Sequence, residues 1–133
     1  MLITTAFFAS VLALMFIKLS MNVIGLRRKN KVSLGAGGVD ELDRAIRAHG
    51  NFAEYVPLSL FLMGALELNG APLLLVAILG LLMVVVAGAG YWLAQHQGTA
   101  NNFYGLVAIA MVLYGAVTAL AVKVTPWSAK RKN

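Results

Sequence analysis

Three polar side chains recur at helical spacing in the segment RAIRAHGNFAEYVP. Arg47, Asn51 and Glu54 occupy positions i, i+4 and i+7, so a helix would present them as one stripe. Arg44 and Tyr55 fall close to the edges of this stripe. A guanidinium can hold a carboxylate through two parallel hydrogen bonds, and a carboxylate can accept hydrogen bonds from an ammonium. The stripe therefore fits a small ligand that carries both a carboxylate and an ammonium group.

The same three side chains also fit a purely structural role. A charged side chain at the centre of a bilayer costs about 2.5–3.5 kcal/mol on insertion scales, so such groups turn inward, pair with one another or line a wet cavity. Arg47 and Glu54, two turns apart, would then belong to a polar network that fixes helix packing, with Asn51 between them. Spacing alone does not separate this network from a ligand site.

The composition indicates whether the protein is surrounded by water or by lipid. Of the 133 residues, 60% are hydrophobic and 12% are charged, and the mean hydropathy is +0.81. Five acidic and eleven basic residues cannot cover the exterior of a soluble domain of this length. The sequence therefore predicts one small integral membrane domain.

The residue inventory excludes several kinds of reactive site. The chain has no cysteine, which excludes a disulfide framework, a thiolate metal site and a cysteine nucleophile. Its two histidines and five carboxylates have no zinc-ligand spacing, and neither a phosphate-binding loop nor a serine triad is present. We therefore expect no metal.

Four apolar spans each approach the roughly 20 residues that a helix needs to cross a hydrocarbon core of about 30 Å. The second span, about 52–68, follows the polar segment. Asp40 has the character of an N-cap for this helix, with Glu41 and Asp43 in the first turn. We expect an all-α four-helix membrane bundle as a single domain over the whole chain. Its predicted helices are about 2–26, 41–68, 72–95 and 103–124, followed by a basic tail at 125–133.

The third and fourth spans carry glycines among alanines: Gly80, Gly88, Gly90, Gly105 and Gly115. Small residues let membrane helices approach closely, which favours a compact bundle or an oligomer. Glycine is also common in any membrane helix, so these positions alone do not define an interface.

The net charge of +6 is concentrated in two basic clusters that border apolar spans. Contact with anionic lipid headgroups explains such clusters more simply than nucleic acid binding does, and we expect no nucleic acid partner. Four helices place both chain ends on one side of the membrane, with the first and third loops on the other. Because the first helix usually dominates orientation and nothing basic precedes it, we place the 27–47 region in the cytoplasm.

Two stretches carry a family resemblance. RAHGNFAEYVP, together with VIGLRRKNKVSLGAGG upstream, closely resembles the bacterial branch of the membrane-associated eicosanoid and glutathione metabolism family, MAPEG. The match covers about residues 19–70. The resemblance implies an inner-membrane homotrimer of four-helix subunits, with a glutathione site between neighbouring subunits that opens to the cytosol. Family members include glutathione transferases, leukotriene and prostaglandin E synthases, and a lipid-binding protein without catalytic activity.

The resemblance also assigns residues to glutathione. Arg27 matches an arginine that holds a glutathione carboxylate, and His49 stands where a glutamine contributes in the leukotriene-forming member. Two arginines and one glutamate suit the two carboxylates and one ammonium of glutathione. The residues implied to contact glutathione are Arg27, Arg47, His49, Asn51, Glu54, Tyr55, Tyr91 and Gln95, the last standing where a family tyrosine is expected.

The chain departs from the family pattern at the group that activates the thiol. Family enzymes use an arginine near the start of the fourth helix, since a nearby cation lowers the pKa of a thiol and so generates the nucleophilic thiolate. This chain has no Lys or Arg between Arg47 and Lys123. The polar residues left in that neighbourhood are His96, Asn101, Asn102 and Tyr104. Catalytic residues therefore stay unassigned, and binding is better supported than catalysis.

Three functions are consistent with this sequence. As an enzyme, the protein would conjugate glutathione to a hydrophobic electrophile arriving from the lipid, or reduce a lipid hydroperoxide. As a binding protein, it would keep the scaffold and hold a lipid or another hydrophobic molecule without activating a thiol. A small proton-coupled exporter would use Glu54 as its essential carboxylate, although such a group is expected in the first helix.

Overall fold

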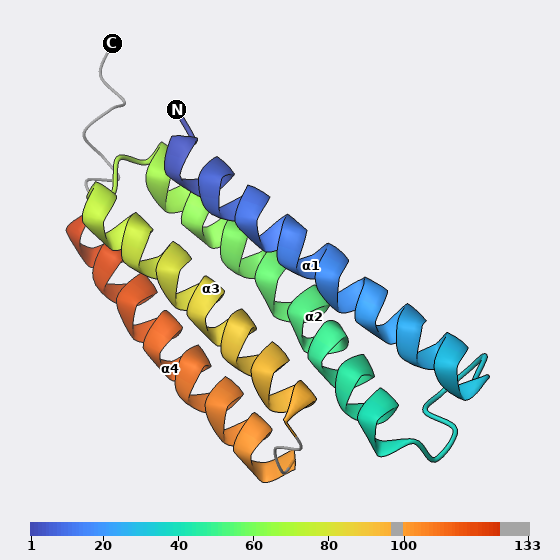
Figure 1. Cartoon of the computed structure of the whole chain (residues 1–133). Helices are drawn as coiled ribbons and strands as arrows, with labels where there is room; N and C mark the ends of the chain where they lie inside the picture. Colours follow the sequence, from blue (N-terminus) through green and yellow to red (C-terminus); the bar gives the residue numbers. More distant parts are fainter. Residues whose placement is uncertain (97–99, 126–133) are drawn as a thin grey trace.

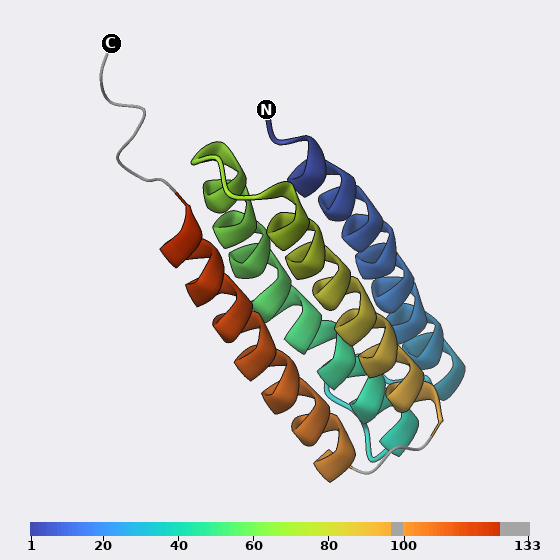
Figure 2. The same cartoon turned by 90° about the vertical axis from the view of Figure 1, so that its left-hand side faces the viewer.

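The computed structural model describes residues 1–96 and 100–125, which form four helices and, within these ranges, no strand. Consecutive helices run in opposite directions and lie side by side, so the start of the first helix and the end of the last lie at the same end of the bundle (Figures 1 and 2). The predicted all-α four-helix fold is confirmed. The helices are α1 (Ile3–Asn30), α2 (Asp40–Leu68), α3 (Leu73–Gln95) and α4 (Ala100–Val124).

Helix α1 continues four residues beyond its predicted end. Its last turn contains Arg27, Arg28 and Lys29, whose positive charges complement the negative end of the helix dipole. Lys31 then takes the left-handed conformation, with φ of 55°, and the N–H of Val32 donates to the carbonyl of Arg27 at 3.0 Å. Arg27, Arg28 and Lys29, which lie beyond the predicted end of the helix at about residue 26, therefore form its last turn.

The start of α2 differs from the prediction in one residue. Asp40 is the first helical residue and not the N-cap, which is Val39. The carbonyl of Val39 accepts a hydrogen bond from the N–H of Asp43 at 3.0 Å, and no side chain caps the helix. Asp40, Glu41 and Asp43 instead place three negative charges in the first turn, where the helix dipole favours them.

Three helical segments in the described part of the chain are long and apolar enough to cross a membrane: α1, α3 and residues 107–124 of α4. The second predicted span, about 52–68 in α2, does not meet this criterion. Its apolar stretch contains Glu54, Pro57 and Glu67, which lower its hydropathy. Helix α2 nevertheless packs along both α1 and α3, antiparallel to each of them, so its axis lies alongside the spans around it (Figure 1). The chain is an integral membrane protein.

The core lies where α1, α2 and α3 meet, around Leu12, Phe52, Met63 and Leu79. Helix α4 packs mainly on α3. The outer faces of the bundle are also apolar, as membrane-facing surfaces are. Among the large hydrophobic side chains that are more than half exposed are Phe7, Leu14, Phe61, Leu73, Leu81 and Val112.

Gly80 of α3 packs directly against Phe8 of α1. A Cβ atom at this position would overlap the Phe8 ring. We expect Gly80→Ala to destabilise the protein, because overpacking costs about 1–3 kcal/mol and exceeds the roughly 1 kcal/mol that alanine gains over glycine in a helix. At Gly88 in the same helix, the nearest atom to such a Cβ is Met15 Cε at 3.9 Å. Thermal unfolding in detergent should therefore show a lower midpoint for Gly80→Ala than for Gly88→Ala, and equal midpoints would contradict this packing.

Candidate functional site

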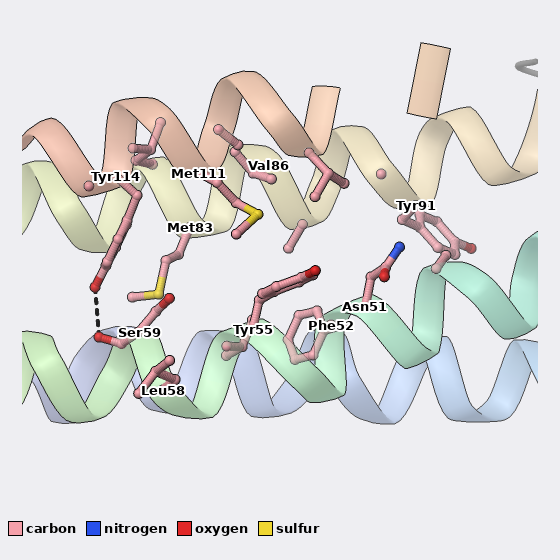
Figure 3. Close-up of a pocket in the computed structure, with 18 of the residues that line it drawn as sticks. Asn51, Phe52, Tyr55, Leu58, Ser59, Met83, Val86, Tyr91, Met111 and Tyr114 are labelled. Carbon is pink, nitrogen blue, oxygen red and sulfur yellow. Dashed lines mark hydrogen bonds between the residues drawn. The ribbon is translucent and has the colours of Figure 1, made fainter. Parts of the chain in front are cut away.

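A pocket of about 240 Å³ lies between α2, α3 and α4. Figure 3 shows Tyr55 from α2 directed into it, together with the thioethers of Met83 from α3 and Met111 from α4. Its walls are almost entirely apolar. A pocket of this kind suits a hydrophobic molecule held by shape and by a few polar contacts.

The polar groups of the pocket lie at its two ends. Asn51 and Tyr91 lie toward the end of the bundle that holds the first loop, and the Tyr55 hydroxyl points toward them from the middle of the pocket (Figure 3). At the other end, the Tyr114 hydroxyl of α4 donates a hydrogen bond of 2.7 Å to the carbonyl of Ser59 in α2. That bond ties α2 to α4 across the pocket. The loop-side end therefore keeps the polar side chains that can meet a ligand.

Arg47 and Glu54 lie on an exposed side of α2, next to this pocket but outside its lining. The Nε of Arg47 donates to Oδ2 of Asp43 at 2.8 Å, and both side chains are about half exposed. Among the described residues, Glu54 makes no hydrogen bond or ion pair. The three residues of the predicted stripe therefore have different surroundings. Asn51 faces α3 and α4 and lines the pocket, whereas Arg47 and Glu54 lie beside the pocket on the exposed side of α2.

Arg44 contributes a cation close to the loop-side end of the pocket. Its half-buried side chain crosses to α3, where Nε donates to the carbonyl of Ala94 at 3.3 Å. That carbonyl belongs to the last turn of α3, whose carbonyl groups lack partners within the helix and carry the negative end of the dipole. Arg44 therefore closes the end of α3 and holds α2 against it.

His49 lies on the opposite side of α2, against α1. Its Nε2 is 3.0 Å from the Ser20 hydroxyl, and its ring stacks on Phe16 with centroids 4.9 Å apart. The Ser20 hydroxyl also donates to the carbonyl of Phe16 at 2.9 Å, so Ser20 links His49 to the backbone of α1. His49 and the pocket residue Asn51 therefore face different surfaces of the subunit.

Arg27 is also separated from the pocket. Its Nη1 donates to the carbonyls of Ser33 and Gly35, at 3.1 and 3.0 Å, and so holds the first loop against the end of α1. Arg27 and His49 thus share the α1 side of the subunit. In a single chain they do not meet Asn51, Tyr55 and Tyr91.

The end of α3 carries the remaining candidates. Gln95 is exposed and does not line the pocket. His96 stacks on Trp92 with ring centroids 4.7 Å apart, and its Nδ1 is 3.0 Å from the carbonyl of Trp92. The side chains of Asn101, Asn102 and Tyr104 lie outside the described residues. No group of three His, Cys, Asp or Glu side chains in the described ranges could hold a metal ion.

Several pocket residues carried no signal in the sequence. Met83, Met111, Ser59 and Tyr114 lie within apolar spans, where such side chains usually pack against other helices or lipid. Only their convergence from three helices identifies them. Of the residues that the resemblance assigns to glutathione, Asn51, Tyr55 and Tyr91 line this pocket.

Comparisons with known proteins place the chain in a family. A family model described as the MAPEG family matches residues 5–129, which include most of all four helices. Over 93 residues the chain is 38% identical to the protein named inner membrane protein YecN in two strains of Escherichia coli, and this alignment covers 70% of the chain and 71% of that relative. No solved structure matches the chain significantly.

Proposed function

Because the chain belongs to the MAPEG family, we propose that it binds glutathione beside α2 and a hydrophobic molecule in the pocket between α2, α3 and α4. One observation carries this proposal. Asn51, Tyr55 and Tyr91, three of the residues assigned to glutathione by resemblance, line a single pocket. The similar Escherichia coli protein is named as an inner membrane protein, which supports the same location here.

The charged groups beside the pocket suit the peptide part of glutathione. Arg47 can hold a carboxylate and Glu54 can accept from the ammonium group, while the amide of Asn51 can bond the peptide backbone. These three side chains occupy neighbouring positions on two adjacent sides of α2. A peptide lying along this edge would place its thiol near the apolar pocket.

A homotrimer would complete the site. Glu54 lies roughly 20 Å along α2 from Asp40, at about 1.5 Å per residue, and is exposed beside apolar Leu58. A charge exposed to lipid at this depth would be costly, so a neighbouring subunit that covers it is favoured. Arg27 and His49, which lie on the α1 side, would then reach the peptide from that neighbour.

Two modes of action follow from the hydrophobic pocket. In a transferase, the glutathione thiolate attacks the electrophilic carbon of an aryl halide or similar molecule, the new carbon–sulfur bond forms and the halide leaves. In a binding protein, the pocket holds a hydrophobic molecule and no bond changes. The absence of any Lys or Arg between Arg47 and Lys123 favours the second mode.

A thermal unfolding measurement in detergent tests the binding of glutathione. A ligand at about 100 times its Kd stabilises a protein by about 2.7 kcal/mol, so millimolar glutathione should raise the unfolding midpoint by several degrees. Glutathione disulfide, which lacks the thiol, provides the comparison. An unchanged midpoint at millimolar glutathione would contradict the proposal.

Conjugation of an aryl halide then separates the two modes. Turnover that rises with pH supports the enzyme, whereas bound glutathione without turnover at any pH supports the binding protein. Gly115→Phe should obstruct the pocket, because Gly115 lines it and a Cβ there meets no atom within 4 Å. This change should weaken the hydrophobic ligand and leave glutathione binding intact, while the exposed Gly105→Phe outside the pocket serves as the matched control.

A further inference from the structure

A second cavity lies at the end of α1, away from the pocket between α2, α3 and α4. It is lined by Ile24, Arg27, Arg28, Lys31, Val32 and Ser33. Two of these residues are apolar and three are cationic. The cavity therefore combines an apolar wall with a cluster of positive charge.

The cations of this cavity differ in how they are engaged. Arg27 is fixed by its bonds to the carbonyls of Ser33 and Gly35, and neighbouring Lys29 lies 3.9 Å from Glu41. Arg28 and Lys31 are exposed, and within the described residues no carboxylate pairs with either. These two side chains can therefore be neutralised by an anion that the chain does not supply.

The position of the cavity identifies the kind of anion. It lies where the apolar span of α1 ends and the first loop begins. Ile24 and Met21, one and two turns before Arg28, are exposed large apolar side chains. Leu34 in the adjoining loop is 88% exposed, which suits contact with lipid better than with water. An anion bound here would thus lie next to an apolar surface of the protein.

We propose that this cavity binds the headgroup phosphate of an anionic phospholipid, through Arg28 and Lys31, with the acyl chains along Met21 and Ile24. Basic pockets at the cytoplasmic boundary of membrane helices recognise such headgroups. A soluble phosphate would satisfy the cations equally well but would leave the apolar surface uncovered. Of the three cations that line the cavity, Arg27 is assigned to glutathione, whereas Arg28 and Lys31, which would hold the phosphate, are not.

The expected affinity change can be estimated from the charges. Each Lys or Arg near an anionic membrane surface contributes about a fivefold factor, so Arg28→Gln with Lys31→Gln should weaken phosphatidylglycerol binding by about thirtyfold. The charge-retaining Arg28→Lys with Lys31→Arg should bind within a few-fold of the original protein. Lys123→Gln removes an exposed lysine at the opposite end of the bundle and should leave the affinity unchanged.

Native mass spectrometry of the detergent-solubilised protein, titrated with phosphatidylglycerol or phosphatidylcholine, provides the measurement. Preferential retention of phosphatidylglycerol that is lost in the double glutamine variant supports the site. Equal retention of both lipids, or equal losses in the glutamine and charge-retaining variants, would overturn it. Inorganic phosphate added at matched ionic strength should not displace the lipid, and displacement would identify a site for soluble anions instead. The helical circular dichroism of each variant verifies that its bundle is intact.

Discussion

Arg47→Ala should weaken glutathione binding by about tenfold to a hundredfold. A hydrogen bond to a charged group contributes about 1.5–3 kcal/mol, and 1.4 kcal/mol corresponds to a tenfold change in affinity. Arg47 lies at the edge of the loop-side pocket, and its guanidinium is the group assigned to a glutathione carboxylate. Isothermal titration of the solubilised protein with glutathione would measure the loss. Arg47→Lys should give an intermediate affinity, because an ammonium keeps the charge but cannot bond both carboxylate oxygens in parallel.

Asp43 supplies the matched control for this experiment. It accepts from Arg47 in the described structure, and both side chains are about half exposed. An exposed ion pair contributes about 0–1 kcal/mol, so a ligand carboxylate can compete with Asp43 for the guanidinium. Asp43→Asn should therefore bind glutathione as tightly as the original protein, or slightly more tightly. If Arg47→Ala and Asp43→Asn gave the same affinity, Arg47 would have only the structural role that its spacing also allows.

The fold was predictable because the bilayer simplifies the problem. Long apolar spans must be helices in lipid, where every backbone group needs an internal partner. The ends of these helices were predicted less well, since local chemistry determines them. Helix α1 includes Arg27 and Arg28 and ends before Lys31, which has a left-handed conformation. The pattern of apolar residues does not predict where this helix ends.

The candidate site was predictable only in part. The i, i+4 relation of Asn51 and Tyr55 does place both on one side of α2, as the pocket requires. The i, i+2 spacing of His49 and Asn51 already puts their side chains on opposite sides of a helix, but which of these sides meets α3 and α4 depends on tertiary packing. The sequence also could not predict the pocket itself, because Met83 and Met111 converge only when the helices assemble.

Glu67 illustrates a structural role that only the packing of helices reveals. The first turn of α1 has no side-chain cap of its own, so its N–H groups need other partners. Glu67, in the last turn of α2, accepts hydrogen bonds from the N–H groups of Thr4 and Thr5 at 2.9 and 2.8 Å. It also accepts from the buried Thr5 hydroxyl at 2.6 Å. The end of one helix thus caps the start of another, and its negative charge meets the positive end of the α1 dipole.

Glu67→Ala should lower the free energy of unfolding by about 3 kcal/mol. The change removes one N-terminal cap, worth about 1 kcal/mol, and leaves the buried Thr5 hydroxyl without its acceptor, which adds about 1–3 kcal/mol. Glu67→Gln keeps one acceptor oxygen and should lose about half as much. Thermal or denaturant unfolding in one detergent would compare the variants.

Glu54→Ala provides the reference for this comparison when glutathione is absent. Glu54 belongs to the same helix but is exposed and makes no bond among the described residues, so its removal should change stability little. A cap that joins two helices must be broken whenever α1 separates from α2, and its loss should therefore accelerate unfolding. Equal stability of Glu67→Ala and Glu54→Ala would show that water or lipid headgroups satisfy the start of α1 as well as Glu67 does.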